Sequence, residues 1–179
     1  STKDLASGRA TILYDSEQSD RTLLDEPETF GEGTTTITNT GIVMSEAVVI
    51  VCVDEGGVAL PERVVGEVCV ASPVATCTWY WRNEDKTAAC YRQCVRAASG
   101  AVMPGEFYAT GDMGFVHNGG LYVCGRKKEM IIIKGANFYP TDIEPTVERA
   151  HASLRPGNLC VFSHDTGEQE EVVVVAEMR

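Results

Sequence analysis

Short apolar segments rich in valine and isoleucine recur through the chain, and glycine, aspartate or proline bounds most of them. Residues 47–53 and 66–71 are two such segments, on either side of the turn Asp54-Glu-Gly-Gly57. β-Branched runs of this length between turn residues are typical of strands. Further runs of this kind cover residues 130–133, 158–163 and 172–176. The chain is therefore predicted to fold mainly as short β-strands.

A tight hairpin is the clearest local signal in the sequence. Asn118-Gly-Gly120 separates the strand-like segments 114–117 and 121–124. Asparagine followed by glycine supplies the positive φ angles that a two-residue turn needs. The two segments are therefore predicted to pair as antiparallel strands.

Two helices are predicted, a short one around residues 83–87 and a longer one over residues 142–151. Before the longer helix, Thr141-Asp-Ile-Glu144 fits a capping box, in which the threonine hydroxyl and the glutamate carboxylate each accept from an unpaired backbone N–H. Pro145 is compatible with this helix because it falls in the first turn, where no intrahelical N–H bond is lost.

The order of these elements predicts an α+β fold. The first forty residues are polar and are expected to be loop-rich with two weak strands. The chain is then β-rich to about residue 126, as in a distorted barrel-like unit, and continues as strand, helix, strand, strand. Lys127 and Lys128 are polar residues between two apolar blocks and mark the expected domain boundary. The predicted units are residues 1–126 and residues 127–179.

Charge excludes some classes of partner. The 179 residues include 26 acidic and 15 basic side chains, for a net charge of −11. This balance argues against nonspecific binding to nucleic acid or to an anionic membrane. No apolar run approaches the roughly 18 to 20 residues that a membrane span requires, and no secretory signal opens the sequence.

Seven cysteines, an odd number, lie mostly in strand-like runs. This pattern favours reduced thiols and a cytoplasmic location over a disulfide framework. Cys90 and Cys94 with Cys77 and His117 match no metal-knuckle spacing, so no metal site is predicted. Buried cysteines of this kind commonly act as small hydrophobic residues.

Several short motifs occur in a fixed order over about a hundred residues. Tyr108-Ala-Thr-Gly-Asp112 precedes the hairpin, Gly125-Arg126 follows it, and Lys134-Gly135 and Asp142-Ile-Glu144 come later. Each alone is a common turn or helix sequence. As an ordered set they resemble the adenylate-forming superfamily of acyl-CoA synthetases, peptide-synthetase adenylation domains and luciferases.

Three of these passages are most similar to fatty-acyl-AMP ligases, namely Gly111-Asp-Met-Gly-Phe115, Gly135-Ala-Asn-Phe-Tyr-Pro140 and Asp142-Ile-Glu144. Upstream, Gly66-Glu67, Tyr80-Trp81, Glu84 and Thr87 fit a further passage of the superfamily, although Thr78-Trp79 stands where its members have a small residue and a glycine. The resemblance covers about residues 38–179.

The resemblance implies a nucleotide site. Asp112 would accept both ribose hydroxyls with its carboxylate, and Arg126 would reach the ribose or the α-phosphate with planar donors that lysine lacks. Val123, on the strand leading to Arg126, would touch the nucleotide. The alternatives are a turn-capping aspartate, a surface ion pair and a core valine.

The resemblance also implies a moving part. Lys128 matches the hinge position, about which the small C-terminal domain rotates between adenylation and acyl-transfer poses. Gly135 and Asn137 belong to the segment that lines the pantetheine channel. The alternatives are a solvated lysine and an ordinary turn before a helix.

The resemblance further implies an incomplete enzyme. The phosphate loop and the catalytic lysine of the superfamily are absent, so no catalytic residue is assigned and the chain is not expected to be active alone. It would comprise the end of the large N-terminal domain, the hinge and the start of the C-terminal domain. Such a part exposes apolar surface, which predicts self-association or a companion fragment.

The complete enzyme would use ATP and Mg²⁺ to make a fatty acyl-adenylate, and would pass the acyl group to the pantetheine of an acyl-carrier protein. Two alternatives stay open. One is an acyl-CoA synthetase, with CoA as acceptor, and the other is a non-catalytic relative that uses the scaffold for binding.

Overall fold

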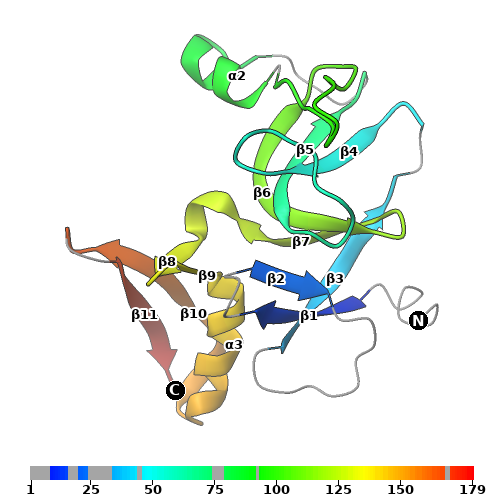
Figure 1. Ribbon diagram of the computed structural model, residues 1–179. Helices are drawn as coiled ribbons and strands as arrows, with labels where there is room; N and C mark the ends of the chain where they lie inside the picture. The colour runs from blue at the N-terminus through cyan, green and yellow to red at the C-terminus, as the bar shows by residue number, and fades with distance from the viewer. Residues whose placement is uncertain are drawn as a thin grey trace.

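The largest sheet of the computed structural model is antiparallel and has seven strands (Figure 1). The structure describes residues 9–15, 20–23, 34–43, 46–73, 79–91, 93–167 and 170–179. The sheet has the strand order β2-β1-β3-β7-β6-β5-β4. Its strands are β1 (Arg9–Asp15), β2 (Asp20–Leu23), β3 (Thr34–Ile42), β4 (Val49–Val53), β5 (Gly66–Ala71), β6 (Tyr108–His117) and β7 (Gly120–Arg126).

The strand predictions hold, and the N-terminal region has more strand than expected. Its described residues form three strands instead of two, and β3 pairs with β7. Because β2 and β4 each lie at an edge, the described strands make an open sheet and not a closed barrel.

The predicted hairpin is formed by β6 and β7. Asn118 has a φ of 49° and Gly119 a φ of 74°, so the turn has the two left-handed residues expected from Asn-Gly. Phe115 and Tyr122 lie opposite each other across the hairpin, and their rings stack with centroids 5.0 Å apart. Both are almost fully buried, with Ile37 and Cys124 beside them. This cluster fixes β7 against β3 and β6.

A second buried cluster supports the other half of the sheet. It contains Val53, Cys69, Val95 and Phe107. The short helix α2 (Glu84–Cys90) lies near β6 at the edge of this region, and its N-cap is Asn83, whose side chain accepts from the backbone N–H of Lys86. The predicted helix is thus confirmed, and it extends three residues beyond residue 87.

The segment after β7 does not join the large sheet. It begins with a 3₁₀ turn, η1 (Lys127–Glu129), and the hairpin of β8 (Ile131–Ile133) and β9 (Ala136–Phe138). Helix α3 (Pro140–Ala150) then packs against β10 (Leu154–Asp165), which forms a hairpin with β11 (Glu170–Met178), as Figure 1 shows in yellow to red. Among the described residues no helix is long and apolar enough to cross a membrane.

The capping box predicted for this helix is wrong. Helix α3 begins at Pro140, and its N-cap Tyr139 makes no side-chain capping bond. Proline suits this position because its missing N–H has no partner at a helix start and its φ is already helical. Thr141 therefore lies inside the first turn, and Glu144 accepts from the backbone N–H of Val161 on β10 at 3.4 Å. The two side chains join the helix to neighbouring strands instead of capping it.

Candidate functional site

The β6–β7 hairpin places Asp112 directly opposite Arg126. The Arg126 Nε lies 3.3 Å from the Asp112 Oδ1, and the side chains are 69% and 32% exposed. A carboxylate and a guanidinium thus meet at the open end of the hairpin with much of each group facing solvent. The pair can offer a carboxylate acceptor and planar N–H donors to one ligand.

Hydrogen bonds of Thr110 and the backbone conformation of Gly111 fix the residues before Asp112. The Thr110 hydroxyl donates to the carbonyl of Val68 on β5 at 2.9 Å and accepts from the Asp112 N–H at 3.0 Å. Gly111 has a φ of 77°, a conformation that favours glycine. Each residue of the Thr-Gly-Asp motif therefore helps to set the direction of the Asp112 carboxylate.

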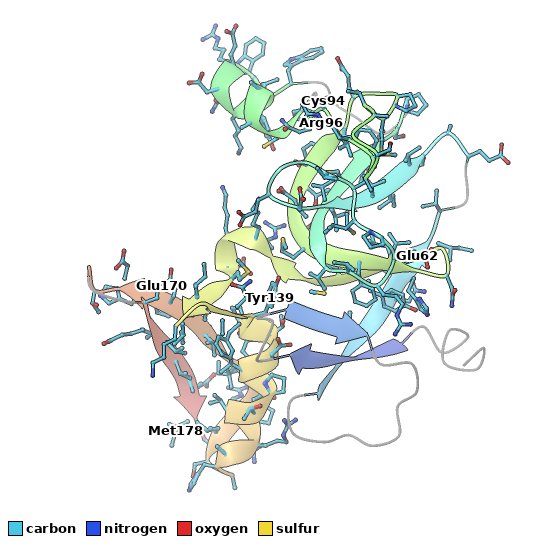
Figure 2. All side chains as sticks on the ribbon, viewed as in Figure 1. Glu62, Cys94, Arg96, Tyr139, Glu170 and Met178 are labelled. Atoms are coloured by element: carbon cyan, nitrogen blue, oxygen red, sulfur yellow. The ribbon has the colours of Figure 1, made fainter. Side chains whose placement is uncertain are left out.

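Gly125 is the point where the C-terminal segment contacts β7. A Cβ atom at this position would lie 2.5 Å from the Cδ1 of Tyr139. Tyr139, labelled in Figure 2, is only 3% exposed and lies just before α3. The Thr141 hydroxyl also donates to the carbonyl of Cys124 at 3.3 Å. The glycine of the Gly-Arg motif thus leaves room for a buried tyrosine ring.

A second ion pair follows immediately in the sequence. The Lys127 Nζ lies 2.7 Å from the Glu67 Oε2, and the side chains are 46% and 19% exposed. Glu67 lies on β5, so this contact joins η1 to the large sheet. On the same strand, burial raises the pKa of the Cys69 thiol to about 11, and the Glu67 charge raises it further while the Lys127 charge lowers it. Lys128, the next residue, is exposed in η1.

The other expected residues lie apart from this pair. Val123 is half-buried on β7 opposite Gly114. Gly135 occupies the β8–β9 turn with a φ of 81°, and Asn137 pairs in register with Ile132. Within the described residues, no hydrogen bond or ion pair links Gly135 or Asn137 to Asp112 or Arg126.

The structure adds contacts that the sequence analysis did not assign. Glu170 at the start of β11, labelled in Figure 2, accepts from the backbone N–H of Ile132 at 2.7 Å. This carboxylate attaches the β8–β9 hairpin to the C-terminal hairpin. Glu67, Lys127, Tyr139 and Glu170 carry the long-range contacts around the site. The sequence analysis placed Glu67 and Tyr139 in motifs and Lys127 at a domain boundary, but it assigned none of these contacts.

The part of the chain that the structure describes contains no group of three His, Cys, Asp or Glu side chains arranged for a metal ion. Cys77, one member of the set considered from the sequence, lies outside the described residues. We therefore assign no metal ligand among the described residues.

Comparisons with known proteins point to one class of enzyme. Residues 128–179 match the family model described as Disco-interacting protein 2-like, AMP domain. The medium-chain-fatty-acid–[acyl-carrier-protein] ligase JamA of Moorena producens is 39% identical over 114 residues, which are 64% of this chain and 18% of that protein. A putative acyl-CoA synthetase of Caulobacter vibrioides is 34% identical over 125 residues, which are 70% of this chain and 20% of that protein.

Solved structures agree with these relatives. A structure from studies of fatty acyl-adenylate ligases from E. coli and L. pneumophila superposes with a TM-score of 0.68 at 25% identity. The match covers 96% of this chain and 28% of that one. The chain thus spans about a fifth of the length of these curated relatives and somewhat over a quarter of the solved structure.

Proposed function

We propose that this chain, which belongs to the adenylate-forming superfamily of acid-activating ligases, is part of a fatty-acyl-AMP ligase. It would form one edge of the nucleotide site and the hinge between the two domains. The observation that carries the proposal is the Asp112–Arg126 pair at the end of the β6–β7 hairpin. Residues 1–126 would then end the large domain, and residues 127–179 would begin the small one. The change from the large sheet to separate hairpins after Arg126 supports this division.

The chain's own residues would bind the sugar of ATP. One Asp112 oxygen faces Arg126, and the carboxylate is exposed enough to accept from the two ribose hydroxyls. Arg126 would steady the ribose or the α-phosphate, and Val123 would lie beside the nucleotide. ATP supplies the adenylyl group, which passes to the fatty acid carboxylate as pyrophosphate leaves. Any ligands for Mg²⁺ would come from outside the described residues.

In the second half-reaction, the acyl transfer, the segment after Lys128 would move. Rotation about Lys128 would bring the β8–β9 hairpin, with Gly135 and Asn137, to the channel of an acyl-carrier pantetheine. The pantetheine thiol would then displace AMP and form a thioester. The likeness to JamA, which is named as a ligase for an acyl-carrier protein, supports this acceptor. The six cysteines in the described part are thiols, which is consistent with a cytoplasmic enzyme.

Nucleotide binding tests the proposal directly. Isothermal titration of the full-length protein with a non-hydrolysable acyl-adenylate mimic should show binding. Asp112→Asn should weaken it about tenfold to a hundredfold, the value of hydrogen bonds to a charged group. Asp85→Asn, the same change on exposed α2, is the matched control. Absence of binding, or equal affinity in Asp112→Asn, would refute the proposal.

A second candidate is an acyl-CoA synthetase, favoured by the likeness to the Caulobacter protein. The two candidates differ in the acceptor. The full-length protein is incubated with ATP, Mg²⁺, a fatty acid and either CoA or a phosphopantetheinylated carrier protein. Acyl-AMP and acyl-carrier protein are expected. Formation of acyl-CoA alone would establish the second candidate.

A further inference from the structure

Two consecutive cationic residues, the last of β7 and the first of η1, contact carboxylates on two successive strands. Arg126 meets Asp112 on the neighbouring strand β6, and Lys127 meets Glu67 on β5, one strand further away. In the sheet, Glu67 lies opposite Met113, and Met113 lies opposite Gly125. Lys127 therefore reaches across β6 to make its ion pair.

Glu67 is the less exposed partner of this pair. Its side chain is 19% exposed, and the Lys127 Nζ is its hydrogen-bond donor at 2.7 Å. A carboxylate that has lost much of its water needs a charged or hydrogen-bonding partner, because leaving it unpaired costs more than the pair contributes. The contact is thus directional, and it restricts where the backbone of residue 127 can lie.

The turn η1 begins without a capping side chain. Its N-cap residue Arg126 makes no side-chain capping hydrogen bond. Tyr139 packs against Gly125, the residue before Arg126. The Tyr139 contact would have to break if the C-terminal segment rotated, whereas Lys127 precedes the proposed pivot at Lys128 and would keep its partner.

We propose that Glu67 is a positioning residue, which through Lys127 fixes the end of β7 so that Arg126 faces Asp112 and the free rotation of the chain begins at Lys128. This inference rests on the proposed function for the roles of Asp112, Arg126 and Lys128. Glu67 itself touches neither substrate nor reacting atoms. It is part of the Gly66-Glu67 motif, for which the sequence offered no chemical role.

The first test measures how far the Glu67–Lys127 ion pair restricts the backbone after β7. In the full-length protein, Glu67→Gln keeps the side-chain shape and removes the charge. Hydrogen exchange of the backbone amides of residues 127–133 should become about threefold to fivefold faster, the size expected for a partly exposed ion pair. Glu106→Gln is the matched control, since Glu106 is exposed near the start of β6. It should leave this exchange unchanged.

The second test measures the effect on the nucleotide site. Glu67→Gln should raise the KM for ATP by about threefold to fivefold with kcat nearly unchanged, because a displaced Arg126 weakens ground-state and transition-state binding alike. The charge reversal that combines Glu67→Lys with Lys127→Glu should restore both readouts toward the unaltered protein. Each reversal alone should not.

The outcomes separate the two proposals. If the unaltered protein binds neither ATP nor the adenylate mimic, the proposed function fails, and with it the nucleotide role of Glu67. If nucleotide binds but Glu67→Gln matches Glu106→Gln in exchange and in KM, the assignment of Glu67 is overturned. A combined reversal no better than the single reversals would overturn it as well.

Discussion

Replacing Gly125 by alanine tests whether this glycine is required by packing. Its added Cβ would lie 2.5 Å from Cδ1, 3.3 Å from Cε1 and 3.4 Å from Cγ of Tyr139. These atoms belong to a ring that is 3% exposed, so it cannot swing into solvent. The φ of Gly125 is not left-handed, and the cost therefore arises from crowding and not from backbone strain.

The expected magnitude follows from two opposing effects. Forcing an extra methyl group into a packed site costs about 1–3 kcal/mol. Alanine also lowers the conformational entropy of the unfolded chain, which stabilises by about 0.4–1 kcal/mol. The net loss in the free energy of unfolding should be about 1–2 kcal/mol, or about 2–8 °C in Tm for a chain of this length.

The assay is urea unfolding of the unaltered protein and its variants, followed by far-UV circular dichroism. Gly56→Ala is the control, since Gly56 also lacks a left-handed φ and a Cβ there would meet only the Asp54 side chain, at 3.3 Å. A double-mutant cycle with Tyr139→Ala completes the test, because the alanine at position 125 should cost little once the ring is gone. An equal cost in both backgrounds would refute the reasoning.

Three further predictions concern thiols, a turn and association. Burial raises the pKa of Cys52 to about 12 and that of Cys69 to about 11. Iodoacetamide at pH 8 should therefore label the exposed Cys94 and Cys160 first, as followed by mass spectrometry. The free energy of unfolding should fall as pH rises above about 9, because there only the unfolded chain loses the protons of Cys52 and Cys69. Early labelling of Cys52 would contradict this. Asn118→Ala should cost about 1 kcal/mol in thermal unfolding and Asn118→Gly should cost less, because the turn needs a φ of 49°. The chain alone should self-associate in size-exclusion chromatography, and a monomer with a cooperative melt would contradict that.

Local chemistry made part of the fold predictable. Asn118-Gly119 identified the β6–β7 hairpin because the turn conformation depends on those two residues alone. Asn83 similarly begins α2 with a bond to its own helix. The helix start at Pro140 was missed because Thr141 and Glu144 fitted a local pattern, yet both side chains are used by distant strands. A sequence pattern cannot reveal that a side chain has a better partner far along the chain.

The Glu67–Lys127 contact shows the same limit at the candidate site. Its residues are separated by 60 positions, and three strands must align before they meet. Tyr139 and Gly125 likewise meet only because α3 starts beside the end of β7. The motifs predict which residues would act on a nucleotide, whereas the tertiary structure shows how those residues are held.

Register decides whether Asp112 and Arg126 can act together. The turn at Asn118-Gly119 pairs His117 with Gly120, and this register continues to Gly114 and Val123. Continued unchanged, it would place Asp112 opposite Gly125, and Arg126 would point to the other face, since a slip of one residue reverses every side chain. An irregularity between Met113 and Gly114 adds one residue on β7, and Asp112 then faces Arg126. The turn residues predict the hairpin, but they do not predict the bulge, on which the pairing of Asp112 with Arg126 also depends.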